Sequence, residues 1–145
     1  MKHIPCLLLP VMLLALTGCG EEVTVPEDRI LLIERSTNAA WGHFDEGWFL
    51  DSDGGIYSFD FSANIGGNFG SQEAFLHKLY TVRSLTGPYC TVDAGTVQKL
   101  CRQSQKIAPD AAFNSTFTAV DAGERSVYIV QEDGSLTLLR ETGDR

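Results

Sequence analysis

Three side chains in the first half of the chain are of types suited to hydrolytic chemistry. His43, Asp51 and Asp53 supply an imidazole and two carboxylates, which are groups that serve as general acids and bases. Asp51 and Asp53 also begin like a calcium loop, but Gly55 stands where a third oxygen ligand is needed and Ile56 where the turn requires glycine. We therefore interpret this stretch as a turn, and expect neither a metal nor a cofactor.

The motifs of common hydrolases do not occur in the sequence. It contains neither a GxSxG nucleophile motif nor an HExxH zinc motif. The adjacent carboxylates of Asp45 and Glu46 would point to opposite faces of a strand, which makes them a poor acid–base couple. We expect a protein that is not an enzyme, and a small hydrolase using Asp51, Asp53 and His43 is the alternative.

Aromatic residues are concentrated in one short segment. Residues 41–61 hold seven of the fourteen aromatic side chains of the protein, including both tryptophans. Trp41, Trp48 and Tyr57 are our candidates for a binding surface that grips a peptide, a glycan or a partner protein, because such rings combine apolar faces with a polar edge. The alternative interpretation places the rings in the core of a small sheet.

The amino-terminal residues 1–18 have the pattern of an export signal. Lys2 supplies a positive start, and residues 4–16 form an uncharged run that is shorter than the ~20 residues a membrane-spanning helix needs. The end of this run, Leu16-Thr17-Gly18-Cys19, resembles the lipobox of bacterial lipoproteins. The resemblance implies cleavage before Cys19 and attachment of acyl chains, such as palmitate, to this residue.

The resemblance also implies a location in the cell. The protein would lie in the cell envelope and contact the membrane through its lipid anchor, with residues 19–28 as a polar tether. Gly20 follows Cys19. An aspartate at this position would commonly retain a Gram-negative lipoprotein at the inner membrane. For a Gram-negative source, the lipoprotein pattern therefore favours the outer membrane.

The charge of the chain excludes one class of partner. The full sequence has 11 basic and 19 acidic residues, and removal of Lys2 with the signal leaves 10 basic residues and a net charge of −9. A protein this acidic repels phosphate backbones, so we expect no nucleic-acid partner. Cationic partners are compatible with this charge, but a high net charge also simply keeps a protein soluble, which is the favoured interpretation. From the lipoprotein pattern and the aromatic segment we expect a non-enzymatic binding or accessory module whose partner is an envelope protein, peptide or glycan.

Two cysteines remain after processing, since Cys6 leaves with the signal and Cys19 carries lipid. Cys90 and Cys101 form an even pair in an oxidising compartment, so we expect a disulfide between them. Eleven residues of unbroken helix would separate their Cα atoms by about 16 Å, so the chain must turn back between them. Gly95 offers a place for that turn.

The elements that would position these residues are predicted from hydrophobic periodicity and turn chemistry. Asp53-Gly54 and Asp133-Gly134 each stand between apolar runs, which is typical of a β-hairpin. Ser71 is suited to cap the first of two expected helices. We expect strands at 29–35, 41–51, 55–61, 113–119, 126–132 and 135–140, and helices at about 72–84 and 96–107.

These elements predict a single domain over residues 29–145. The order of strand, hairpin, two helices, strand and hairpin is typical of the α+β class. We expect an antiparallel sheet of two hairpins plus additional strands, with both helices packed on one face.

Overall fold

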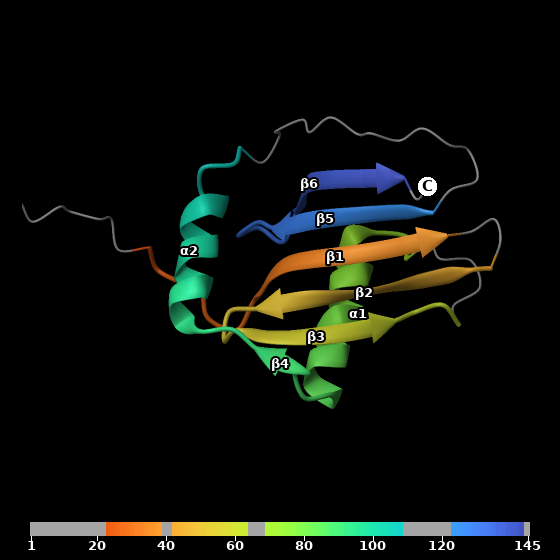
Figure 1. Cartoon of the computed structure of the whole chain (residues 1–145), viewed down its shortest axis with the longest axis horizontal. Coiled ribbons are helices and arrows are strands. Elements are labelled where there is room, and N and C mark those ends of the chain that lie inside the picture. Colours follow the sequence, from red (N-terminus) through yellow and green to blue (C-terminus); the bar gives the residue numbers. More distant parts are fainter. Residues whose placement is uncertain (1–22, 39–41, 64–68, 109–122, 144–145) are drawn as a thin grey trace, which may run out of the picture.

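The computed structural model describes residues 23–38, 42–63, 69–108 and 123–143, which form one sheet and two helices. The chain is therefore of mixed α+β class (Figure 1). In chain order the elements are β1 (Ile30–Asn38), β2 (Phe44–Asp51), β3 (Gly55–Asp60), α1 (Gln72–Leu85), β4 (Cys90–Thr91), α2 (Ala94–Ser104), β5 (Glu124–Val130) and β6 (Leu136–Gly143).

The six strands form one antiparallel sheet in the order β4-β3-β2-β1-β5-β6. β1 lies inside the sheet and pairs with both β2 and β5 (Figure 1). The first strand of the domain is therefore hydrogen-bonded on both sides. β4 and β6 form the two edges. β4 has only two residues, so one edge of the sheet is much shorter than the strand beside it.

The connection from β2 to β3 is made by residues 52–54. Gly54 adopts a φ of +85°, and a Cβ at this position would lie 2.4 Å from the carbonyl oxygen of Val92. Only glycine fits both the backbone conformation and the close approach. Between β5 and β6, Gly134 adopts the same conformation with a φ of +82°. Glycine thus ends both Asp-Gly turns in the left-handed region.

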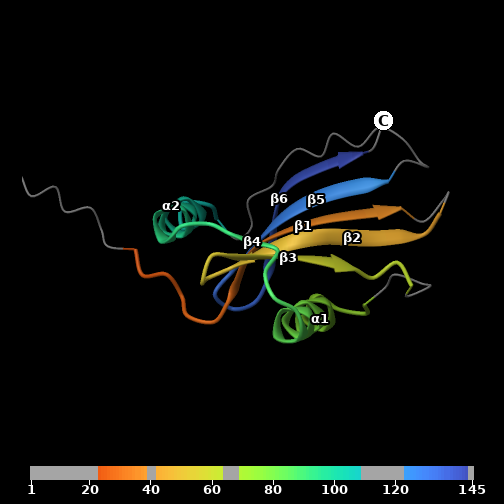
Figure 2. The same cartoon turned by 60° about the horizontal axis from the view of Figure 1, so that its bottom comes forward.

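α1 covers one face of the sheet. The Oγ of Ser71 accepts a hydrogen bond from the amide of Ala74 at 3.1 Å and caps the helix as expected. The helix buries one side against inward-facing strand residues and so forms the main core of the domain (Figure 2). The buried members of this core are Ile30, Ile33, Phe49, Tyr57, Phe59, Phe75, Leu76, Leu79 and Val130.

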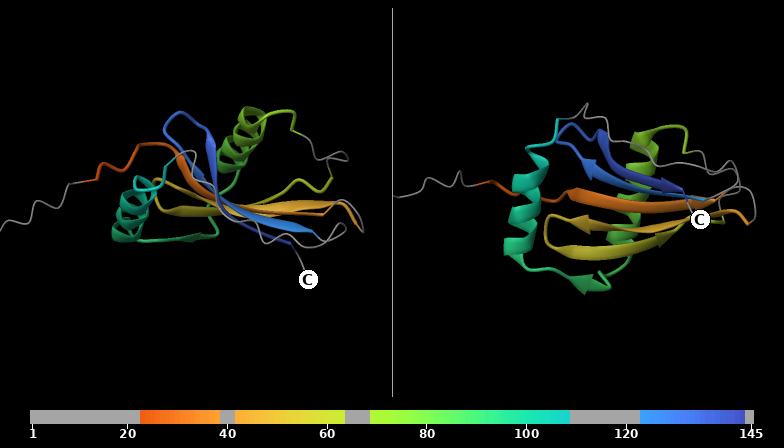
Figure 3. Two further views of the ribbon diagram at one scale, coloured as in Figure 1. Left: turned by 90° about the horizontal axis from the view of Figure 1, so that it is seen from above. Right: turned by 45° about the horizontal axis from the view of Figure 1, so that its top comes forward.

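α2 belongs to a second, smaller cluster of buried residues formed by Leu31, Val97 and Cys101. Leu31 and its neighbour Ile30 belong to different clusters, because adjacent residues in a strand point to opposite faces. Figures 2 and 3 show α2 at one end of the sheet, away from α1. The expectation that both helices pack on one face is therefore not confirmed.

The expected disulfide between Cys90 and Cys101 is not formed in the structure, where both are free thiols. Cys90 is exposed in β4, and Cys101 is buried in α2. The helix begins at Ala94, since the side chain of Asp93 accepts from the amide of Thr96 and acts as the cap. Cys101 consequently lies about 10 Å along the helix from its start and is buried in the second cluster, whereas Cys90 is exposed at the edge of the sheet.

The segment expected to be a tether is partly packed on the domain. Val23 and Val25 contact the second cluster, and Asp28 forms an ion pair with Arg83 of α1.

The lipobox with Cys19, Trp41 and the strand expected at 113–119 lie outside the described residues. In the part of the chain that is described, neither helix is long and apolar enough to cross a membrane.

Candidate binding surface

The structure brings Asp51 and Asp53 together around a residue that the sequence did not single out. Arg83 donates from Nε to Oδ2 of Asp51 at 2.7 Å and from Nη2 to Oδ2 of Asp53 at 3.0 Å. Its third nitrogen pairs with Asp28. The Asp51 side chain is only 1% exposed, so this ion pair is buried at its centre.

Backbone groups complete the surroundings of Asp51. Its Oδ1 accepts hydrogen bonds from the amides of Asp53 at 3.1 Å and Gly55 at 2.7 Å. The neighbouring Tyr57 has a raised pKa because burial disfavours the phenolate, and the charge of Asp51 adds to the effect. With both carboxylate oxygens occupied, Asp51 holds the turn and α1 in place and is poorly placed to exchange protons with a substrate.

The alternative catalytic set is not assembled. His43 precedes β2 and Asp51 ends it, and eight residues of extended chain span about 26 Å at about 3.3 Å per residue. A general acid or base acts within hydrogen-bond reach of its partner. Within the described residues, no three His, Cys, Asp or Glu side chains lie close enough to form a metal site.

The three candidate aromatic residues differ in where the structure places them. Tyr57 is 9% exposed and stacks on Phe49 with ring centroids 5.1 Å apart, so its expected role in a binding surface is wrong. Tyr57 faces the core because it is paired with Phe49, whose side chain points to the same face. Trp48 is half-buried on the opposite face, and Trp41 is outside the described residues.

Trp48 lies in a shallow hollow on the sheet face opposite α1. The hollow has a volume of about 470 Å³ and spans four strands, β3, β2, β1 and β5. Its lining residues are Glu34, Ser36, Glu46, Gly47, Trp48, Ser58, Phe59, Asp60 and Arg125. We call this the acidic hollow, because three carboxylates and one guanidinium line it.

One of these carboxylates is paired within the hollow. Arg125 donates from Nε to Oε1 of Glu34 at 2.8 Å. Asp60 is exposed, and the hydroxyl and amide of Ser62 hold its pKa below the usual range. Asp60 therefore keeps its negative charge beside Trp48 even under mildly acidic conditions. The result is an aromatic side chain among predominantly negative groups.

The chain was compared with protein families, curated proteins and solved structures. No family model, curated protein or solved structure matches it. The function of the chain is therefore inferred from the geometry of its sites.

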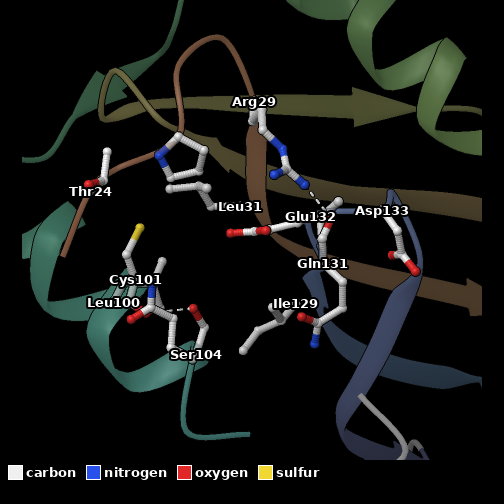
Figure 4. Close-up of a pocket in the computed structure, with 13 residues that line it drawn as sticks. Thr24, Arg29, Leu31, Leu100, Cys101, Ser104, Ile129, Gln131, Glu132 and Asp133 are labelled. Carbon is white, nitrogen blue, oxygen red and sulfur yellow. Dashed lines mark hydrogen bonds between the residues drawn. The ribbon is translucent and has the colours of Figure 1, made fainter. Parts of the chain in front are cut away.

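A second hollow of about 380 Å³ lies between α2, the segment before β1 and the turn after β5 (Figure 4). Leu31, Leu100 and Ile129 supply apolar walls, and a guanidinium nitrogen of Arg29 donates to the carbonyl of Gln131. The thiol of Cys101 also lines it, but burial raises the pKa of this thiol. A protonated thiol is a weak nucleophile, so this hollow offers packing without an evident reaction.

The acidic hollow was only partly accessible to sequence reasoning. Trp48 was found from the concentration of aromatic residues. Glu34, Asp60 and Arg125 come from three different strands, and only the register of the sheet brings them together. Alternation along each expected strand could have placed each on the polar face, but not beside the others.

Proposed function

We propose that this protein is a lipid-anchored lipoprotein of the bacterial cell envelope and a non-enzymatic binding module. In this proposal its acidic hollow binds a cationic segment of another envelope protein. The observation that carries the binding proposal is Trp48, half-buried among Glu34, Glu46 and Asp60. The lipobox-like residues Leu16-Thr17-Gly18-Cys19 support the anchor.

The chemistry of the hollow favours a cationic side chain over an apolar or anionic one. An indole face attracts an ammonium or guanidinium group by about 0.5–2 kcal/mol, depending on how far the pair is removed from water. Glu46 and Asp60 add attraction at longer range, and the net charge, −8 for the full sequence and −9 without residues 1–18, extends it over the protein surface. An anionic glycan or a nucleic acid would be repelled by the same groups.

A synthetic peptide tests the binding proposal. We expect the full chain in detergent to bind a fluorescein-labelled peptide of nine alternating lysine and valine residues, with binding measured by fluorescence anisotropy at low salt. Trp48→Ala and Glu46→Lys should each weaken binding by about tenfold, since each removes or reverses an attraction of roughly 1 kcal/mol or more.

The matched control is Glu132→Lys, which makes the same charge change at an exposed position in the turn between β5 and β6. It should leave the affinity within about twofold, apart from the general effect of net charge. Equal losses for Glu46→Lys and Glu132→Lys would mean that the peptide responds to total charge, and would remove the acidic hollow from the proposal.

The anchor is tested separately by its chemistry. The protein isolated from a bacterial envelope should begin at Cys19 and carry the mass of attached acyl chains, and it should partition into detergent. Cys19→Ser should abolish the added mass of the acyl chains. An unmodified Cys19 in the isolated protein would contradict the anchor and leave the binding proposal standing.

A further inference from the structure

β3 is longer than the strand that flanks it at the edge of the sheet. β4 pairs only with Gly55 and Ile56, the first two residues of β3 (Figure 1). Among the described residues, no strand lies beside the remaining four residues, Tyr57–Asp60, on that side. The second part of β3 is therefore at the edge of the sheet, although β4 is the outermost strand in the strand order.

The direction of the backbone groups of β3 follows from two hydrogen bonds at its ends. The carbonyl of Ile56 accepts a hydrogen bond from the amide of Tyr89 at 2.9 Å, so the backbone groups of Ile56 point away from β2. The amide of Phe61 donates to the carbonyl of Asp45 at 2.7 Å, so the backbone amide of Phe61 points toward β2. Backbone groups alternate along a strand, which turns those of Ser58 and Asp60 away from β2.

We call the outward N–H and C=O groups of Ser58 and Asp60 the open edge. Both residues are exposed, and no strand pairing in the described chain uses these groups. Proline lacks an amide hydrogen, so Pro88 cannot extend the ladder that Tyr89 begins. Tyr89 is 64% exposed and borders the place where β4 could have continued.

The open edge adjoins the acidic hollow. Ser58 and Asp60 line the hollow with their side chains, while their backbone groups point out of the sheet. A strand added here would lie in line with β4 and would be antiparallel to β3. Residues directly opposite each other in such a pair share a face, so those opposite Ser58 and Asp60 would extend over the hollow.

We propose that the cationic partner binds by adding an extended segment to the open edge as a further antiparallel strand. This inference rests on the proposed function and specifies how the partner is held. The backbone groups of Ser58 and Asp60 supply up to four hydrogen bonds, and the acidic hollow selects for side chains. The partner segment carries basic residues at two alternate positions, opposite Ser58 and Asp60.

Charge identifies the occupant as another protein rather than a second copy of this chain. Two copies paired through their open edges would place the acidic hollow of one beside the acidic hollow of the other. The negative groups of the two hollows would repel each other, and the full sequence of each copy carries a net charge of −8. A basic extended segment meets the same edge with opposite charge.

Backbone methylation of the lysine–valine peptide tests this inference on the full chain in detergent. In the proposed register the lysine amides donate to the open edge, and the valine amides point into solvent. N-methylation of the lysines should weaken binding by at least about tenfold, because each N-methyl group removes one hydrogen bond and introduces a clash. N-methylation of the valines should change the affinity by less than about threefold.

Amide hydrogen exchange measured by NMR gives the second readout. Binding of the unmodified peptide should slow exchange at Ser58 and Asp60 by about tenfold or more, since their amides become hydrogen-bonded. The amides of Tyr57 and Phe59 point toward β2 and serve as controls within the same strand. Their exchange should not change by more than about twofold.

The outcomes separate this inference from the proposed function. If the unmodified peptide binds but both methylated peptides bind equally well, strand addition is wrong and the binding module stands. Slow exchange at Ser58 and Asp60 without peptide would show that the open edge is already covered, and would overturn the inference. If the unmodified peptide does not bind at all, the proposed function fails and strand addition fails with it.

Discussion

Replacing Arg83 with methionine should lower the free energy of unfolding by about 3–5 kcal/mol. Arg83 contacts three carboxylates, and the Asp51 side chain is 1% exposed. Removal of the guanidinium leaves the charge of Asp51 in the protein interior with only backbone amides as partners. An unpaired buried charge is costly even where the intact pair adds little net stability.

Urea unfolding followed by circular dichroism would measure this loss. Arg102→Met is the matched control, because Arg102 is an exposed arginine in the last turn of α2. It should change the free energy of unfolding by less than about 0.5 kcal/mol. Adding Asp51→Asn to Arg83→Met should recover part of the loss, since the amide oxygen can still accept from Gly55 without carrying a charge.

An effect of Arg83→Met no larger than that of Arg102→Met would mean that Asp51 is reached by water in solution. The three carboxylates would then remain available for other partners. The same result would reopen the question of acid–base chemistry at this end of the sheet.

Replacing Tyr57 with alanine should also lower the free energy of unfolding by about 3–5 kcal/mol, as expected for a buried aromatic residue. Its ring stacks on Phe49 in the main core and is 9% exposed. The substitution removes this contact and leaves a cavity beside the buried Asp51. Thermal and urea unfolding would both detect a loss of this size.

Tyr89→Ala provides the control of the same residue type, because Tyr89 is 64% exposed. We expect it to change stability by less than about 0.5 kcal/mol. If Tyr57→Ala were as mild as Tyr89→Ala and instead weakened binding of the lysine–valine peptide, Tyr57 would belong to a surface after all. The pair of variants therefore separates a core residue from a contact residue.

Much of the fold could be predicted where local chemistry decides the outcome. The turns at Gly54 and Gly134 require positive φ, and the cap at Ser71 requires a short hydroxyl side chain; both signals are visible in a single sequence. The predicted start of α2 at residue 96 is two residues late, because Asp93 caps the helix and starts it at Ala94.

The position of α2 depends on interactions that sequence patterns do not express. Ile30 and Leu31 are adjacent apolar residues, and either could have faced a given helix. The irregular pairing between Ile30 and Leu32 decides which side each one takes. The local pattern therefore predicted two helices but not the part of the sheet that each one covers.

The candidate sites follow the same division. Asp51 and Asp53 were found as neighbours in one turn, but Arg83 is 32 residues away from Asp51 along the chain. Its role depends on how α1 crosses the sheet, which periodicity does not specify. Trp48 and Tyr57 looked equivalent as aromatic residues, and only their opposite faces in β2 and β3 distinguish them.

The contacts of Val23 and Val25 with the domain limit how far the protein can stand from a bilayer. In the proposed anchored form, three residues separate the acylated Cys19 from Val23, the first described residue, which contacts the domain. Even fully extended, four residue steps span only about 14 Å. The attachment is thus short, so in the anchored form the domain is held close to the lipid headgroups.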